Sequence, residues 1–161
     1  MNIFQTNSKL KKDNIYKFSL PAFSTCPAAA DCLSWCYMRK VYILRGVVCR
    51  NAHNRNYELS KKAVFPSVAI HELESRPYIK RLRLHDSGDF YSQGYINFKR
   101  LRLLNNVKMV QSEGGKYKID RRSAHAFVIN SGSPAPVGYV NGSKSDTVAI
   151  KHNRIYLYKR G

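Results

Sequence analysis

Three cysteines lie close together in the stretch TCPAAADCLSWC (25–36), with the spacing C-x5-C-x3-C. Thiolates are soft ligands that bind zinc or the irons of a cluster, and one short loop can deliver several of them together. Three thiolates suit a [4Fe–4S] cluster in which one iron stays open to another ligand. The first prediction is therefore an iron–sulfur site at Cys26, Cys32 and Cys36.

Two alternatives remain open for these cysteines. The same three thiolates could hold a structural zinc ion with Cys49 or His53 as the fourth ligand, because those two residues are four apart on a predicted helix and share a face. Zinc fingers, however, usually bring two pairs of ligands, and this sequence has one further cysteine only. The three thiols could also be ordinary buried side chains.

A second polar cluster lies in RLHDSGDF (83–90), directly after a predicted strand. Ligands of α/β proteins bind at the carboxyl ends of parallel strands, so this cluster predicts a cofactor-binding edge. Gly88 would let the backbone approach a ligand closely. The alternative is a helix N-cap formed by a serine or aspartate. The predicted binding residues are His85, Asp86, Ser87 and Asp89.

The segment QSEGGKY (111–117) is again polar and glycine-rich after an apolar strand. Gly114 and Gly115 would expose backbone amides to a cofactor, although a hairpin turn explains them almost as well. His125 and Asp146 stand at the starts of two further apolar runs. They are further candidate site residues, with a structural histidine and a turn-forming aspartate as the alternatives.

Strands and helices alternate over the first two thirds of the chain, which predicts parallel βα units, whereas the last third is more purely β. The expected fold is one domain over 1–161, with a basic polar lead-in at 1–14. Its class is α/β, with a truncated or incomplete barrel-like sheet, parallel or mixed, and the cysteine-rich loop after the first strand. The predicted strands are 15–21, 78–84, 107–112, 125–130, 137–140, 147–151 and 154–159. The predicted helices are 28–39, 47–62 and 66–76.

The net charge of +18, from 28 basic and 10 acidic residues, predicts a polyanionic partner: nucleic acid or an acidic host protein. A solvated basic shell is the alternative. No apolar run reaches the length of a membrane span, and the first 14 residues have no signal-peptide pattern, so we expect a cytoplasmic protein. Thiols stay reduced there, which favours a metal site over disulfides. Phosphate-loop, serine-hydrolase and zincin motifs are absent from the sequence.

Several segments together resemble one known family, the "gene product 88" proteins of bacteriophages. They are SLPAFSTCPAAADCLSWCYMRK, NRNYELSKK, RLHDSGDFYSQGYI, SEGGKY, DRRSAHAFVI, SDTVAI and RIYLY. The resemblance runs from about residue 17 to the end and is most specific in the cysteine loop and in RLHDSGDF. That family is similar, at a distance, to radical S-adenosylmethionine (SAM) enzymes, in which a three-cysteine loop after the first barrel strand holds a [4Fe–4S] cluster.

This resemblance implies that Cys26, Cys32 and Cys36 are the cluster ligands, and that SAM or a substrate binds near Gly114–Gly115 and Asp86–Asp89. The chain departs from the pattern in its wider cysteine spacing and in a short segment between Ile96 and Val107. The resemblance therefore predicts an iron–sulfur protein of radical-SAM-like descent, with enzymatic activity left open. The alternative is a non-enzymatic basic protein that binds nucleic acid or inhibits a host factor. In either case the host cytoplasm is the expected location.

Overall fold

The computed structural model describes two long segments of the N-terminal half of the chain and shorter segments of the rest. The described residues are 2–27, 32–89, 91–92, 108–112, 126–131, 137–138, 140–141, 148, 151–152 and 154–158. The side chains of 32, 35, 108–112, 126–131, 141 and 154–158 lie outside this description. The short segment between Ile96 and Val107 also lies outside it.

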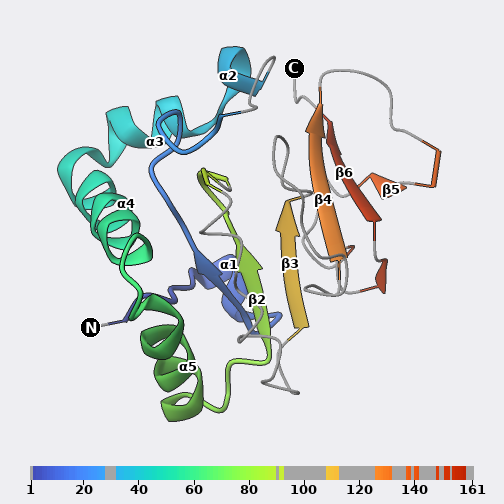
Figure 1. The fold of residues 1–161 in the computed structure, drawn as a ribbon. Coiled ribbons are helices and arrows are strands. Elements are labelled where there is room, and N and C mark those ends of the chain that lie inside the picture. Colours follow the sequence, from blue (N-terminus) through green and yellow to red (C-terminus); the bar gives the residue numbers. More distant parts are fainter. Residues whose placement is uncertain are drawn as a thin grey trace.

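Six strands form a parallel sheet in the order β1-β2-β3-β4-β6-β5 (Figure 1). Every strand pairing in the described sheet is parallel, which confirms the α/β class. The strands are β1 (Ile15–Phe18), β2 (Arg81–Leu84), β3 (Lys108–Ser112), β4 (Ala126–Ser131), β5 (Val140–Asn141) and β6 (Arg154–Tyr158).

The strand predicted at 147–151 is wrong where the structure describes it. Val148 and Lys151 are helical, and the amide of His152 donates to the carbonyl of Val148 at 3.0 Å. That bond joins residues four apart, as in a turn of α-helix. The apolar alternation of this short stretch was too weak to exclude a helical turn.

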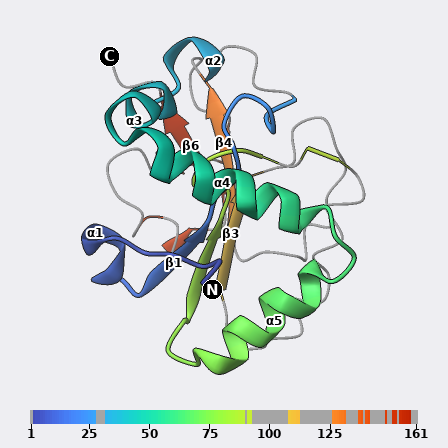
Figure 2. The ribbon, with the colours of Figure 1, turned by 90° about the vertical axis from the view of Figure 1, so that its left-hand side faces the viewer.

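Five helices occur in the described residues: α1 (Ser8–Lys11), α2 (Cys32–Trp35), α3 (Met38–Leu44), α4 (Gly46–Ser60) and α5 (Phe65–Ser75). The last two match the predicted helices, and α4 and α5 lie along one face of the sheet (Figures 1 and 2). Pro66 stands in the first turn of α5, where a proline costs no hydrogen bond. The helix predicted at 28–39 is instead broken, because Cys36 lies between α2 and α3. Cys32 and Cys36 thus do not share the face of one continuous helix.

The hydrophobic core lies between this helical layer and the first two strands. Leu82 and Leu84 of β2 are buried while the alternate Arg81 and Arg83 are partly exposed, as expected for a strand with one apolar face. The ring of Phe18 in β1 packs against Phe65 of α5, with ring centroids 5.3 Å apart. This packing fixes the ends of β1 and β2 from which the polar loops emerge.

The N-terminal segment belongs to this core as well. Ile3 and Phe4 are each 1% exposed, and their amides donate to the two carboxylate oxygens of Glu72 at 2.7 and 3.0 Å. Arg76 completes the arrangement by donating to the same carboxylate at 2.5 Å. The stretch 1–14, expected to be a basic polar lead-in, therefore contributes buried apolar side chains.

Candidate functional site

The carboxyl ends of β1 and β2 continue into two loops, which we call the first loop (19–27) and the second loop (85–89). Backbone hydrogen bonds continue the pairing of the strands beyond their ends. The amide of Leu20 donates to the carbonyl of Ser87 at 2.8 Å, and the hydroxyl of Ser87 donates back to the carbonyl of Leu20 at 2.9 Å. The two loops are thereby held together as one unit.

The closest approach between the loops is at Gly88. Its φ of +81° suits glycine, and a Cβ placed there would lie 2.5 Å from Oγ1 of Thr25 and 2.6 Å from Cβ of Leu20. Thr25 is fully buried, and its hydroxyl donates to the carbonyl of Pro21 at 2.6 Å. The amide of Asp89 donates to the carbonyl of Thr25 at 3.0 Å. The second loop therefore determines where the residue after Thr25, the first cysteine, is placed.

Cys26 and Cys36 are half-buried cysteines near this junction and form no disulfide. Burial raises the pKa of Cys26, and the nearby charges of Asp89 and Cys36 raise it further. The structure thus brings two of the three predicted ligands and one predicted edge carboxylate into mutual electrostatic range. Within the described side chains, no three His, Cys, Asp or Glu residues lie close enough to hold a metal ion. The side chain of Cys32 is outside that set.

The two candidates for a fourth ligand, Cys49 and His53, contact each other on α4. Nε2 of His53 lies 3.7 Å from Sγ of Cys49, and its Nδ1 lies 3.0 Å from the hydroxyl of Tyr42 on α3. That hydroxyl also accepts the amide of Ala22 at 3.0 Å, which ties the helices to the first loop. Burial, with help from the charge of Lys17, lowers the pKa of His53 to about 4, so this imidazole is neutral at pH 7.

The negative charge of the Asp86 carboxylate is balanced by two basic side chains. Its carboxylate pairs with Lys17 of β1 and, at 3.4 Å, with Arg83 of β2, while its carbonyl accepts the hydroxyl of Tyr37 at 2.6 Å. Burial on its own would raise the pKa of Asp86, but Arg83 and Lys17 outweigh that effect and hold it below its ordinary value. Asp86 is therefore an ionised anchor that joins β1, β2 and the start of α3.

His85 and Ser87 point into the protein. His85 has a φ of +59°, its Nδ1 is buried, and burial lowers its pKa to about 3, so the ring is neutral at ordinary pH. Ser87 is 5% exposed and engaged with the first loop. These two residues shape the edge, whereas Asp89 lies close to the thiol of Cys26. The alternative of a helix N-cap is not borne out in the described residues, because Gly88, Asp89, Tyr91 and Ser92 are not helical.

The remaining candidates are not placed by the structure. Gly114, Gly115, His125 and Asp146 lie outside the described residues. The sequence analysis also missed Tyr42, Lys17 and Tyr37 as parts of the site. No sequence signal marks them, because each reaches the loops from another element.

The family model described as "Gene product 88" matches residues 1–112. No curated protein matches the chain, and no solved structure does. The matched range contains the cysteine loop, α3 to α5, the second loop and β3, and it covers well over half of the chain. The chain therefore belongs to the Gene product 88 family, a phage-type family.

Proposed function

We propose that the chain is an iron–sulfur protein of radical-SAM-like descent, in which Cys26, Cys32 and Cys36 hold a [4Fe–4S] cluster. The observation that carries the proposal is the pair of half-buried thiols, Cys26 and Cys36, which interact electrostatically beside the loops that follow β1 and β2. Burial raises the pKa of Cys26, and the charges of Asp89 and Cys36 raise it further, so two ionised thiolates there would be unfavourable without a cation. A bound cation relieves this repulsion and deprotonates its thiols, which is the donor chemistry that a cluster requires.

The contacts of His53 with Cys49 and with Tyr42 support a cluster over a closed zinc site. Both ring nitrogens of His53 already have partners, at 3.0 and 3.7 Å. A zinc ion with four protein ligands would need one of these residues to leave its contacts. A three-thiolate cluster needs neither.

The order of the strands supports the finer fold assignment, a truncated barrel. β1 to β4 are neighbours in chain order and parallel, which is the winding of a βα barrel and not that of a doubly wound sheet. When bound, a [4Fe–4S] cluster supplies one electron at low potential, which radical SAM enzymes use to cleave SAM. This chain's own contribution would be to hold the thiolates, through the two interlocked loops, at the ligand-binding edge of the sheet.

Anaerobic purification followed by metal and sulfide analysis tests this proposal. The expected result is a brown protein that absorbs near ~400 nm and contains iron and sulfide. Colourless protein with one zinc per chain, after anaerobic reconstitution with iron and sulfide, would overturn the cluster and favour the structural-zinc alternative. SAM cleavage by the reduced, reconstituted protein is the further test for catalysis; an intact cluster without cleavage would favour a binding protein.

A second function, nucleic-acid binding, is supported by where the charges lie. Three of the acids in the described part of the chain are paired internally: Glu72 with Arg76, Asp86 with Lys17 and Glu58 with Lys61. Each such pair removes one acid and one base, so the net excess of 18 positive charges, from 28 basic and 10 acidic residues, is left uncompensated. None of the described helices is long and apolar enough to cross a membrane. Affinity for DNA or RNA should fall steeply with added salt, and salt-independent binding would contradict phosphate contact. The host cytoplasm is the location that we propose.

A further inference from the structure

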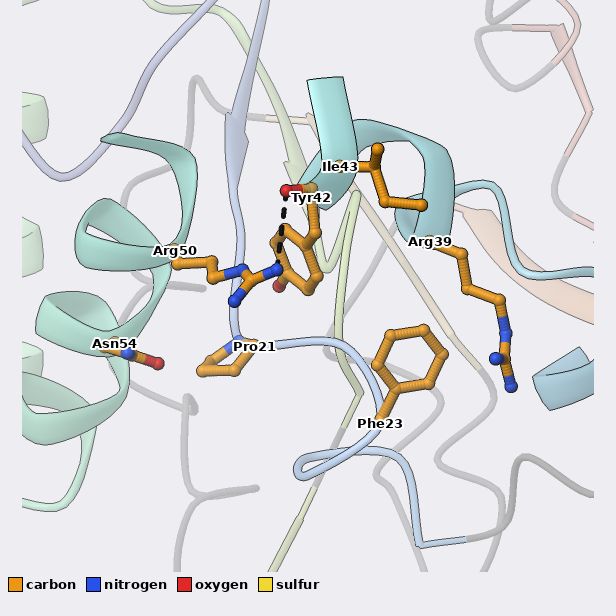
Figure 3. Close-up of a pocket in the computed structure, with 7 residues that line it drawn as sticks. All are labelled: Pro21, Phe23, Arg39, Tyr42, Ile43, Arg50 and Asn54. Carbon is orange, nitrogen blue, oxygen red and sulfur yellow. Dashed lines mark hydrogen bonds between the residues drawn. The ribbon is translucent and has the colours of Figure 1, made fainter. Parts of the chain in front are cut away.

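A pocket of about 500 Å³ lies on the outer side of the first loop, where α3 and α4 meet it (Figure 3). Its volume falls within the range of small-molecule sites. Pro21 and Phe23 from the first loop, Arg39 and Tyr42 from α3, and Arg50 and Asn54 from α4 line it.

Two aromatic rings and two guanidinium groups define the chemistry of this pocket. The rings of Phe23 and Tyr42 lie with centroids 6.4 Å apart and an interplanar angle of 66°. Cζ of Arg39 lies 5.2 Å from the centroid of Phe23, and Cζ of Arg50 lies 5.5 Å from that of Tyr42. Figure 3 shows the two arginines on opposite sides of the ring pair. The pocket thus combines flat apolar surfaces with two flanking positive charges.

Backbone carbonyls hold both guanidinium groups in place. Nε of Arg39 donates to the carbonyl of Leu33 at 3.1 Å, and Nη2 of Arg50 donates to the carbonyl of Tyr42 at 3.4 Å. A guanidinium has five N–H donors, and these contacts use one from each. None of the described lining residues is acidic, so an anion would meet no opposing carboxylate in the lining.

We propose that this pocket binds a nucleotide of a nucleic-acid strand, with the base against the Phe23–Tyr42 ring pair and with Arg39 and Arg50 each holding a phosphate on its own side of the base. Bases stack on aromatic side chains irrespective of sequence, and guanidinium groups bind phosphate in a bidentate manner. This inference rests on the second proposed function, nucleic-acid binding, and gives it a site. It does not require a metal bound to the cysteines, although Phe23 and Cys26 share the first loop.

The pocket favours a single strand over a duplex. A base in a duplex is stacked between its neighbours and paired, so its faces are not available to Phe23 and Tyr42. A longer strand would also bring further phosphates to exposed Lys40 on α3 and to exposed Arg45, which lies between α3 and α4. We therefore expect the nucleotide to belong to a single-stranded segment.

Fluorescence anisotropy with a labelled oligothymidylate of about 12 nucleotides tests the site, since sites of this kind span ~4–16 nucleotides. The Phe23→Ala variant should weaken binding by about 5- to 100-fold, the loss measured for one stacking aromatic, without changing the salt dependence. Arg39→Gln and Arg50→Gln should each lower the slope of log affinity against log salt by about one.

Two control variants make the result specific. Phe23→Leu keeps the apolar volume but removes the aromatic face, and should weaken binding in the same direction as Phe23→Ala even if the alanine variant folds poorly. Lys62→Gln removes one exposed positive charge beyond the far end of α4, about 15 Å of helix rise from Arg50 to Ser60. It should change affinity less than about two-fold, because exposed charges beyond a Debye length are screened.

The possible results distinguish the assignment of this pocket from nucleic-acid binding by the chain as a whole. If the unmodified chain binds no nucleic acid, both the pocket assignment and nucleic-acid binding are overturned. If it binds but Phe23→Ala and Phe23→Leu bind equally well, or if a duplex of the same length binds as tightly, the pocket is wrong and nucleic-acid binding stands. Displacement of the strand by micromolar thymidine monophosphate would support the pocket and identify a free nucleotide as its ligand; displacement only by oligonucleotides supports the strand.

Discussion

Replacing Gly88 by alanine tests the interlock of the two loops most sharply. The added Cβ would lie 2.5 Å from Oγ1 of Thr25, 2.6 Å from Cβ of Leu20 and 3.1 Å from the Leu20 carbonyl carbon. Real Cβ atoms do not approach other atoms so closely, and Thr25 is fully buried and hydrogen-bonded, so it cannot move aside freely. One of the loops must therefore shift.

The expected cost has two parts. A positive φ in a residue with a Cβ costs about 1–2 kcal/mol, and forcing extra atoms into a packed site costs about 1–3 kcal/mol more. We therefore expect Gly88→Ala to lower the free energy of unfolding by about 2–5 kcal/mol. Because Thr25 precedes Cys26, the shift should also reduce the iron that the chain retains.

Gly46→Ala is the matched control. Gly46 also has a positive φ, +40°, but a Cβ there would have no atom of the described structure within 4 Å. It should cost at most about 1–2 kcal/mol from the backbone alone and leave iron retention unchanged. Urea denaturation of both variants measures the difference. Equal stability of the two variants would refute the close approach of the loops.

Three further predictions concern buried groups. Glu72→Gln leaves one of two buried N-terminal amides without an acceptor and should cost about 2–3 kcal/mol in urea denaturation, whereas the exposed Glu74→Gln on the same helix should cost under about 0.5 kcal/mol. Because the folded pKa of His85, about 3, is below the unfolded value of about 6.5, the unfolded chain binds more protons in between. The free energy of unfolding should therefore fall as pH drops from about 6.5 to about 3, by at most about 1.4 kcal/mol per pH unit from this residue. Asparagine tolerates the positive φ of this position, so His85→Asn should reduce that slope, as measured by denaturation at several pH values. Tyr42→Phe removes the phenol contacts to Ala22 and His53 and should cost about 1 kcal/mol by thermal unfolding; an unchanged melting temperature would show that these contacts are not formed in solution.

Local sequence patterns were sufficient to predict the elements that position the site. The alternation of leucine and arginine before residue 85 predicted β2, and Pro66 marked the start of α5. Placing the cysteines after the first strand followed from the same local signals. Such elements are predictable because their apolar periodicity already reflects the face that they bury.

The contacts that complete the site could not be predicted in this way. Lys17 and Asp86 are 69 positions apart, and so are Ile3 and Glu72. These pairs form because the parallel sheet and α5 bring distant segments together, and no local propensity encodes them. The break at Cys36 is similar: the surrounding residues suit a helix, and the structure interrupts it there nonetheless.

The iron content of cysteine variants tests the central claim, that the loop holds an iron–sulfur cluster, most directly. Each of Cys26, Cys32, Cys36 and Cys49 is replaced singly by serine, and the anaerobically reconstituted proteins are compared for bound iron and sulfide. We expect the first three variants to lose the cluster and Cys49→Ser to retain it with the iron content of the unmodified chain. Loss of iron in Cys49→Ser equal to that in Cys26→Ser, or a single zinc and no iron in the unmodified chain, would contradict it.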